Sequence, residues 1–203
     1  ATMETSSMPQ YASLMKEVKL RVKVIDHLAF GGGNALFVPT TVECIYLQLR
    51  KVLELVVFGS LVANKALYSQ VHENFSKHWN AKLLIKDLRR VNPNFYPRAI
   101  HEVEPEDTEK GDHFIDRHDS LTETEFVELF ERCGRILHAD NPFGSKVDWE
   151  QYRKEIMDWR QKILNLLNSH TIRLVDESRF YLVHMEASGD DEVRMYEFQL
   201  VVA

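Results

Sequence analysis

Residues 40–63 place the strongest constraint on how this chain folds. The stretch opens on a capping box, with Thr40 as N-cap and Glu43 at position N3, and the helix that follows is apolar on most sides. A helix that is hydrophobic nearly all round must be covered nearly all round. The sequence therefore predicts that helix 40–63 lies at the centre of a helical bundle.

Four more segments carry the apolar period or the end signals of helices. The run Gly31-Gly32-Gly33 stops one helix, and Asn92-Pro93 stops another. The expected helices span residues 13–30, 68–91, 122–138 and 148–169. Together with helix 40–63 they are enough for a multi-helix bundle.

Two of these helices begin with capping signals. Thr122 and Glu125 form a capping box, and Asp148 is an N-cap with Gln151 at position N3. These signals are local, so they fix where each helix begins. The apolar stripe of the last helix then indicates the side that enters the core.

The pattern changes to β structure after His170. Segments 179–187 and 193–202 are rich in β-branched and aromatic residues and are joined by a short turn, which predicts a β-hairpin. Residues 171–175 are a candidate third strand, and 96–103 with 113–117 are either two short strands or part of a loop. An isolated hairpin is marginal in water, so its apolar side must pack on the bundle or on a partner. The expected apolar side contains Tyr196, Phe198, Leu200 and Val202.

The predicted fold class is mainly α (α+β), a multi-helix bundle with a central apolar helix and a C-terminal antiparallel β-hairpin or small sheet. A length of 203 residues fits a single domain. We divide it into a flexible N-terminal arm, 1–10, a helical bundle, 11–169, with an irregular insertion at 93–119, and a hairpin region, 170–203, packed on the bundle.

Composition bears on the cellular setting. The longest apolar stretch, 52–63, is interrupted by Glu54 and is too short to span a bilayer, so no membrane association is expected. Residues 1–10 lack the features of a signal peptide. Cys44 and Cys133 both fall in apolar helical patterns, as free thiols in a reducing compartment do. A cytoplasmic location is expected.

Charge is distributed unevenly along the chain. Residues 1–100 carry 13 Lys and Arg against 7 Asp and Glu, whereas residues 101–203 carry 12 against 24. Such polarity indicates either a basic face for an anionic partner or two halves that attract each other on folding. We favour the second interpretation.

The most suggestive chemical motif lies near the end of helix 122–138. Arg132 and His138 are six residues apart, with Arg135 between them. An Arg and a His at this kind of spacing in a helical bundle resemble the signature of HEPN domains, many of which are metal-independent ribonucleases. The resemblance covers this motif and the helical context.

The HEPN resemblance implies roles for these side chains. His138 would act as general acid or base at the ribose 2′-hydroxyl, and Arg132 would stabilise charge on the phosphate. Arg135 is the nearer neighbour of His138 on a helix. The resemblance also implies a homodimer, an RNA substrate, no cofactor, and a bacterial defence or toxin-type setting, as an active enzyme or an inactive relative. A structural explanation is open too, because a His in the last helical turn interacts favourably with the helix dipole.

Basic residues recur on one face of helix 68–91. Lys82, Lys86 and Arg89, with Arg90 beside them, form a stripe that is suited to a phosphate backbone. A solvated helix face, or docking against the acidic half of the chain, is the simpler interpretation.

Polar residues of the central helix form a second stripe. Glu43, Arg50 and Glu54 fall on one narrow face, where they could bind a polar ligand or specify self-association. We favour an internal ion pair together with the Glu43 cap.

Metal binding and most common enzyme classes have no support in the sequence. The loop residues His101, Asp112, His113, Asp116 and His118 offer suitable ligands but no recognised spacing, so no metal site is expected. The chain has no Gly-x-Ser-x-Gly, Cys-x-x-Cys, His-Glu-x-x-His or Rossmann fingerprint. Two hypotheses therefore remain: a HEPN-like ribonuclease or its inactive relative, and a non-enzymatic module that binds a protein partner through the β-hairpin and a helical surface.

Overall fold

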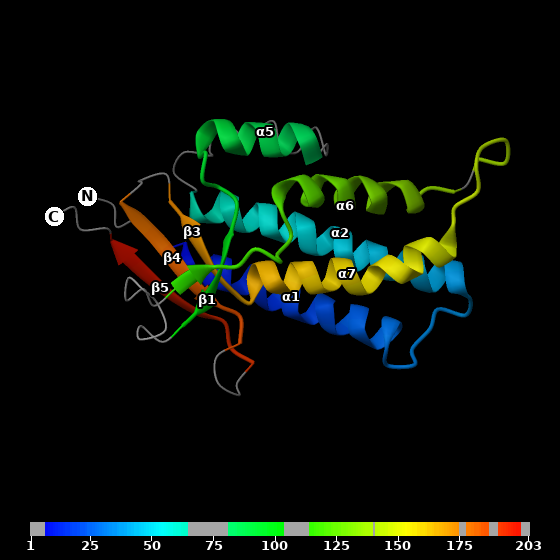
Figure 1. The fold of residues 1–203 in the computed structure, drawn as a ribbon, viewed down its shortest axis with the longest axis horizontal. Coiled ribbons are helices and arrows are strands. Elements are labelled where there is room, and N and C mark those ends of the chain that lie inside the picture. The colour runs from blue at the N-terminus through cyan, green and yellow to red at the C-terminus, as the bar shows by residue number, and fades with distance from the viewer. Residues whose placement is uncertain are drawn as a thin grey trace.

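A computed structural model describes residues 7–64, 81–103, 114–139, 141–174, 178–186 and 191–199. These residues form five α-helices, four of which run side by side, and a five-stranded antiparallel sheet at one end of the bundle (Figure 1). The predicted fold class is confirmed. The helices are α1 (Met8–Ala29), α2 (Val38–Ala63), α5 (Ala81–Val91), α6 (Glu123–Ile136) and α7 (Trp149–Leu167), and the strands are β1 (Arg98–Glu102), β2 (Phe114–Asp116), β3 (Ser169–Arg173), β4 (Arg179–His184) and β5 (Arg194–Gln199).

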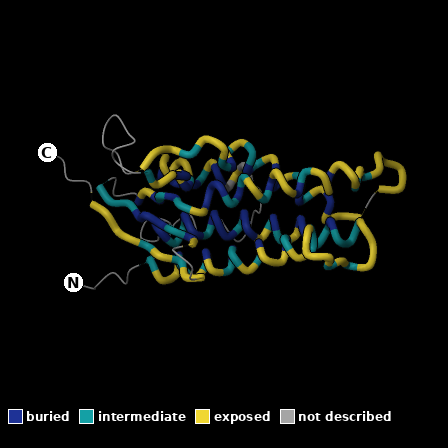
Figure 2. The backbone as a smooth tube through the Cα atoms, turned by 60° about the horizontal axis from the view of Figure 1, so that its bottom comes forward, coloured by how far each residue is buried: buried dark blue, intermediate teal, exposed yellow. Residues whose placement is uncertain are grey.

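Helix α2 lies at the centre of the bundle, as its sequence predicts. It contacts α1, α6 and α7. Leu49, Val52 and Leu53 are completely buried, and buried side chains follow the inner sides of the neighbouring helices (Figure 2). Among the helices in the described part of the chain, none has the length and hydropathy needed to cross a bilayer.

The first two helices begin earlier than predicted. Helix α1 starts at Met8, so residues 8–10 of the expected flexible arm are helical, and residues 1–6 of that arm lie outside the described residues. Helix α2 starts at Val38 with Phe37 as N-cap, and the Thr40 hydroxyl donates to the Phe37 carbonyl at 3.0 Å. The predicted Thr40–Glu43 capping box is therefore wrong. Each helix has a proline in its first two positions, where the fixed φ of proline suits a helix start and its missing N–H costs nothing.

The capping signals of α6 and α7 are confirmed. Thr122 and Glu125 make the reciprocal contacts of a capping box, and the Asp148 carboxylate accepts a hydrogen bond from the Gln151 backbone N–H at 3.0 Å. Helix α5 ends at Val91, before the predicted Asn92-Pro93 stop, and packs on the outside of α6. The expected helical residues 68–80 lie outside the described residues.

The sheet has the strand order β2-β1-β3-β4-β5, with every pair antiparallel. The predicted hairpin is present as β4 and β5, and β3 begins at Ser169, two residues before the predicted start. Strands β1 and β2 come from the 93–119 insertion, which the sequence analysis did not connect to the hairpin. Pairing of β1 with β3 joins the two regions in one sheet.

The two faces of the sheet have different surroundings. Ala99, His170, Val183 and Met195 lie opposite one another on successive strands and face the helices. The expected packing of Tyr196 and Phe198 on the bundle is wrong, because both side chains point the other way and are 47% and 43% exposed, and the alternative of a partner stays open. A shift of one residue in register exchanges the two faces of a strand, and Met195 is the residue of β5 that meets the core. Leu200 and Val202 lie outside the described residues.

Candidate functional site

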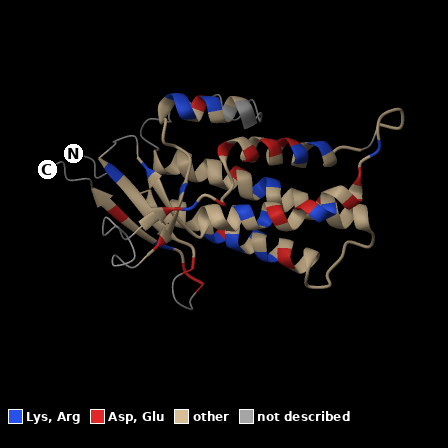
Figure 3. Cartoon of the chain, in the orientation of Figure 1, with Lys and Arg blue, Asp and Glu red and all other residues tan. Residues whose placement is uncertain are grey.

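Helix α6 carries acidic residues along its first turns and arginines at its end. Glu123, Glu125 and Glu128 precede Arg132 and Arg135, and Figure 3 shows the change from acidic to basic along the helix. Negative charge near the N-terminus and positive charge near the C-terminus both interact favourably with the helix dipole. The end of α6 therefore carries two arginines, Arg132 and Arg135, with Glu131 beside them.

Arg132 is held between helices. Its guanidinium donates to the Glu155 carboxylate of α7 and lies 4.7 Å from the centre of the Tyr152 ring. The Arg132 and Glu155 side chains are only 20% and 23% exposed. Burial lowers the pKa of Arg132, but attraction to Glu155 and the nearby tyrosines outweighs burial, so the pKa is raised overall. Arg132 is thus a fixed cation that ties α6 to α7.

Two buried polar atoms beside this ion pair make no hydrogen bond to any described residue. They are Nε of Arg132 and the hydroxyl oxygen of Tyr152. The Tyr46 hydroxyl, by contrast, donates to the Tyr152 carbonyl at 3.1 Å. A group of polar side chains therefore lies inside the bundle where α2, α6 and α7 meet.

Arg135 and His138 lie on the surface beyond this ion pair. Both side chains are exposed, and His138 lies two residues past the end of α6 at Ile136. Among the described residues neither side chain makes an ion pair or hydrogen bond, and neither lines a described pocket. The structure therefore separates the three motif residues into a half-buried Arg132 and a solvent-facing Arg135 and His138.

The polar stripe of α2 contains the favoured ion pair. Arg50 Nε lies 3.2 Å from Glu54 Oε1, and the Arg50 guanidinium lies 4.2 Å from the centre of the Phe130 ring on α6. Glu43 does not belong to this pair and does not cap the helix, because α2 begins at Val38. Arg50 and Glu54 therefore satisfy each other at the α2–α6 contact.

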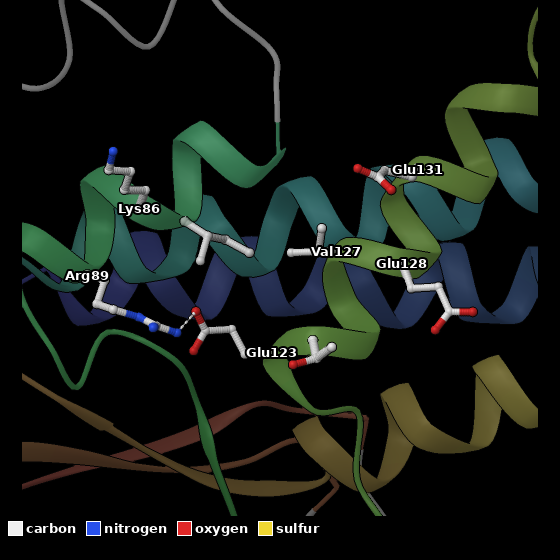
Figure 4. A pocket seen from close by; sticks show the side chains of 8 residues that line it. Lys86, Arg89, Glu123, Val127, Glu128 and Glu131 are labelled. Atoms are coloured by element: carbon white, nitrogen blue, oxygen red, sulfur yellow. Dashed lines mark hydrogen bonds and ion pairs between the residues drawn. The ribbon is translucent and has the colours of Figure 1, made fainter.

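The basic stripe of α5 meets the acidic part of α6 through Arg89. The Arg89 guanidinium donates to Glu123, and Lys86 and Arg89 line a groove of about 520 Å³ between the two helices (Figure 4). Arg90 is exposed, and nothing is described of the Lys82 side chain. The rest of the groove is lined by Ile85, Glu123, Thr124, Val127, Glu128 and Glu131. Docking against an acidic helix thus occupies part of the predicted nucleic-acid face.

The opposite charges of the two chain halves meet at several ion pairs. Lys16 contacts Glu192 at 2.5 Å, Lys19 contacts Asp191 at 3.1 Å, and Arg98 contacts Asp116 at 2.5 Å. Each pair joins a cation of the first 100 residues to an anion of the remainder. The favoured interpretation of the charge asymmetry, attraction within the chain, has direct support.

The candidate metal ligands do not converge in the described part of the chain. No group of three or more His, Cys, Asp or Glu side chains among the described residues could hold a metal ion. Asp116 pairs with Arg98, which lowers the pKa of the Asp116 carboxyl through a hydrogen bond. Asp112 and His113 lie outside the described residues.

An apolar cleft that the sequence analysis missed lies at the end of the bundle away from the sheet. It has a volume of about 470 Å³ and lies between the α1–α2 turn and α7. Leu36 in its wall is 94% exposed and has a φ of 72°, in the left-handed region that a leucine rarely adopts. Phe143, in the α6–α7 connection at the same end, is 96% exposed (Figure 1). The available sequence signals were Phe143 between Pro142 and Gly144, and Leu36 in the short segment between Gly33 and Pro39.

A buried tyrosine–histidine pair is a second feature that the sequence analysis missed. The Tyr11 hydroxyl lies 2.7 Å from His170 Nε2, and His170 Nδ1 lies 2.7 Å from the Leu167 carbonyl oxygen. Since a carbonyl only accepts, Nδ1 carries the proton and Nε2 accepts from Tyr11. Burial lowers the pKa of His170 to about 4. The pair is a neutral link between α1 and the sheet.

Comparison with known proteins adds no relative: no family model, no curated protein and no solved structure matches this chain.

Proposed function

We propose that this protein is a HEPN-like, metal-independent ribonuclease in which Arg135 and His138 act on RNA. The observation that carries the proposal is the exposure of both side chains at the C-terminal end of α6. An anionic substrate can reach them directly, and neither is held by another described residue. The helical context and the Arg/His spacing are the features that resemble HEPN domains.

The proposed reaction is transfer of the phosphate to the ribose 2′-oxygen. His138 takes the proton of the 2′-hydroxyl, the 2′-oxygen bonds to the adjacent phosphorus, and the bond from phosphorus to the 5′-oxygen breaks. Water supplies a proton to the leaving 5′-oxygen, so the products are a 2′,3′-cyclic phosphate and a 5′-hydroxyl, and His138 later returns its proton to the solvent. Arg135 stabilises the charge that develops on the phosphate oxygens.

Arg132 has a different part in this proposal. Its guanidinium is engaged by Glu155 and covered by Tyr152, so it fixes the end of α6 against α7 and positions Arg135 and His138. Preorganised groups are worth more in catalysis than mobile ones. Arg132 is therefore a positioning residue rather than a direct contact of the phosphate.

The proposal includes a homodimer in a bacterial defence or toxin-type system. Leu36, Phe37 and Phe143 are exposed apolar side chains at the same end of the bundle as His138. Joining two copies there would cover these side chains, which water solvates poorly. It would also bring two Arg135–His138 pairs near each other.

Cleavage of labelled single-stranded RNA in EDTA tests the catalytic assignment. We expect the wild-type protein to cleave and the His138→Ala and Arg135→Gln proteins to lose at least 100-fold in rate, about the contribution of general acid–base catalysis. His27→Ala is the matched control, because His27 is another exposed histidine close to the C-terminal end of a helix. Equal cleavage by the wild type and His138→Ala, or none by either, would remove the assignment.

A second candidate function is non-enzymatic binding of a protein partner. The apolar cleft with the strained, exposed Leu36 favours it, since unusual backbone conformations persist where the surrounding structure or a function requires them. Sedimentation velocity of wild-type and Leu36→Ser protein would show whether the cleft joins two copies. A chain that self-associates through the cleft, yet leaves RNA intact, would fit this function and not the first.

A further inference from the structure

The outer face of the sheet carries exposed aromatic rings. Tyr196 and Phe198 project from β5 and are 47% and 43% exposed. Phe180, directly opposite Phe198 on β4, stacks on it with ring centres 5.3 Å apart and an angle of 12° between the planes. We name Phe180, Tyr196 and Phe198 the aromatic surface. Its side chains project from the face of the sheet that is turned away from the helical bundle.

The charged side chains that the described residues of β3, β4 and β5 place on the same face as these rings are arginines. Arg173 lies opposite Phe180, and Arg194 lies opposite His184, all on the same outer face. The acidic residue of β5, Glu197, projects to the other face and lies 3.3 Å from Arg179. The described strands β3, β4 and β5 place no Asp or Glu on the outer face: it consists of Ser169, Thr171, Arg173, Phe180, Leu182, His184, Arg194, Tyr196 and Phe198.

The absence of outward acids on these three strands contrasts with the composition of this part of the chain. Residues 101–203 contain twice as many acidic as basic residues, 24 against 12. A face that combines accessible rings with guanidinium groups suits a ligand with flat apolar rings and negative charge. Single-stranded nucleic acid has both, because its bases stack on aromatic side chains while its phosphates pair with arginines.

We propose that the outer face of the β3–β4–β5 sheet binds single-stranded RNA. Tyr196 and Phe198 are two residues apart on one strand, which sets their side chains about 7 Å apart, and each can stack one unpaired base. Arg173 and Arg194 flank the rings and contact phosphates. A duplex keeps its bases stacked inside and cannot use these rings. The choice of RNA over DNA rests on the proposed ribonuclease function.

This surface is separate from the proposed catalytic residues. The sheet lies at one end of the helical bundle and the C-terminal end of α6 lies towards the other (Figure 1). RNA held on the sheet would be anchored at a distance from His138. Binding and cleavage can therefore be measured independently.

Fluorescence anisotropy with labelled ten-nucleotide oligouridylate in EDTA tests the proposal, with the full chain carrying His138→Ala so that no cleavage disturbs binding. We expect Tyr196→Ala/Phe198→Ala to weaken binding at least tenfold, from the loss of two stacked bases. Tyr196→Phe/Phe198→Tyr keeps the rings and should bind like the parent protein. Leu20→Ala removes an exposed apolar side chain from α1 and should leave affinity unchanged.

Salt dependence supplies a readout that a folding defect would not imitate. Arg173→Gln should reduce the slope of log affinity against log salt by about 0.7, the value for one phosphate contact on a single strand. Oligothymidylate and an RNA duplex serve as comparison ligands, and both should bind more weakly than oligouridylate.

Three results would overturn the proposal. One is the absence of oligouridylate binding, and another is binding that the double alanine variant does not weaken. The third is self-association of the parent protein that Tyr196→Ala/Phe198→Ala abolishes while RNA affinity stays the same, which would make the aromatic surface a protein interface. If the wild-type protein does not cleave RNA, the binding result still stands. The ribonuclease proposal and the RNA-binding proposal can therefore fail separately.

Discussion

His170 should make the stability of this protein depend on pH in a predictable direction. The folded chain holds the neutral imidazole between Tyr11 and the Leu167 carbonyl, and burial lowers its pKa to about 4 from an ordinary 6.5. The unfolded chain therefore binds a proton more readily than the folded chain at any pH between these values. The contribution of His170 to the free energy of unfolding is fully present above about pH 6.5. It decreases as the pH is lowered towards 4.

The size of the effect follows from the two pKa values. Each pKa unit corresponds to about 1.4 kcal/mol, so the full loss is about 3 kcal/mol, of which about 1.4 kcal/mol is reached at pH 5.5 and about 2 kcal/mol at pH 5. A loss of this size is a large part of the net stability of an ordinary domain, which is about 5–15 kcal/mol.

Urea unfolding at pH 7.5, 6.5, 5.5 and 5.0 measures the effect. His170→Gln cannot titrate, so the difference between the wild type and this variant cancels the contributions of the other histidines and carboxylates. We expect the stability of the wild type relative to His170→Gln to decrease as the pH falls, by the magnitudes above. Parallel stability curves for the two proteins between pH 6.5 and 5 would refute the idea that His170 is held neutral.

Two further predictions concern α6. Thr122→Ala removes the N-cap of the capping box and should lower the free energy of unfolding by about 1 kcal/mol in urea, whereas Thr124→Ala in the same turn should have less than half this effect; equal effects would contradict a specific cap. Burial raises the pKa of the Cys133 thiol to about 12, so Ellman's reagent should label the half-buried Cys44 in the native protein and Cys133 only on unfolding. Equal labelling rates of Cys44 and Cys133 in the native protein would show that the reagent reaches the buried side of α6.

Local signals in the sequence predicted the local structure well. The capping residues Thr122 and Asp148 contact backbone groups three residues away, so their effect does not depend on the rest of the fold. The Thr40 prediction failed for a local reason too: Pro39 allows the helix to begin before the capping box, and the Thr40 hydroxyl then bonds back to the preceding turn.

Contacts between distant segments were not predictable in the same way. Tyr11 and His170 are 159 residues apart in the chain, and Arg132 and Glu155 are 23 apart on different helices. The register of β5 depends on its pairing with β4, and either set of alternate residues in β5 contains apolar side chains. Only the assembled sheet shows that Met195, and not Tyr196, meets the core.

The candidate site also combines a local feature, which the sequence shows, with a contact between distant segments, which it does not show. The Arg/His spacing could be read from the sequence, but the partner of Arg132 could not, because it comes from α7 rather than from an acidic residue one turn away on α6. The structure therefore alters the expected roles, by fixing Arg132 and leaving Arg135 and His138 exposed.

Dependence of cleavage on the ribose 2′-hydroxyl tests the central claim most directly. Two labelled oligonucleotides of one sequence are incubated with the wild-type protein in EDTA, one all RNA and the other with 2′-O-methyl groups throughout. Action of His138 at the 2′-hydroxyl predicts that only the unmodified RNA is cut, that the products end in 2′,3′-cyclic phosphate, and that His138→Ala protein cuts neither. Cleavage of the 2′-O-methyl strand, or equal cleavage by the His138→Ala protein, would contradict it.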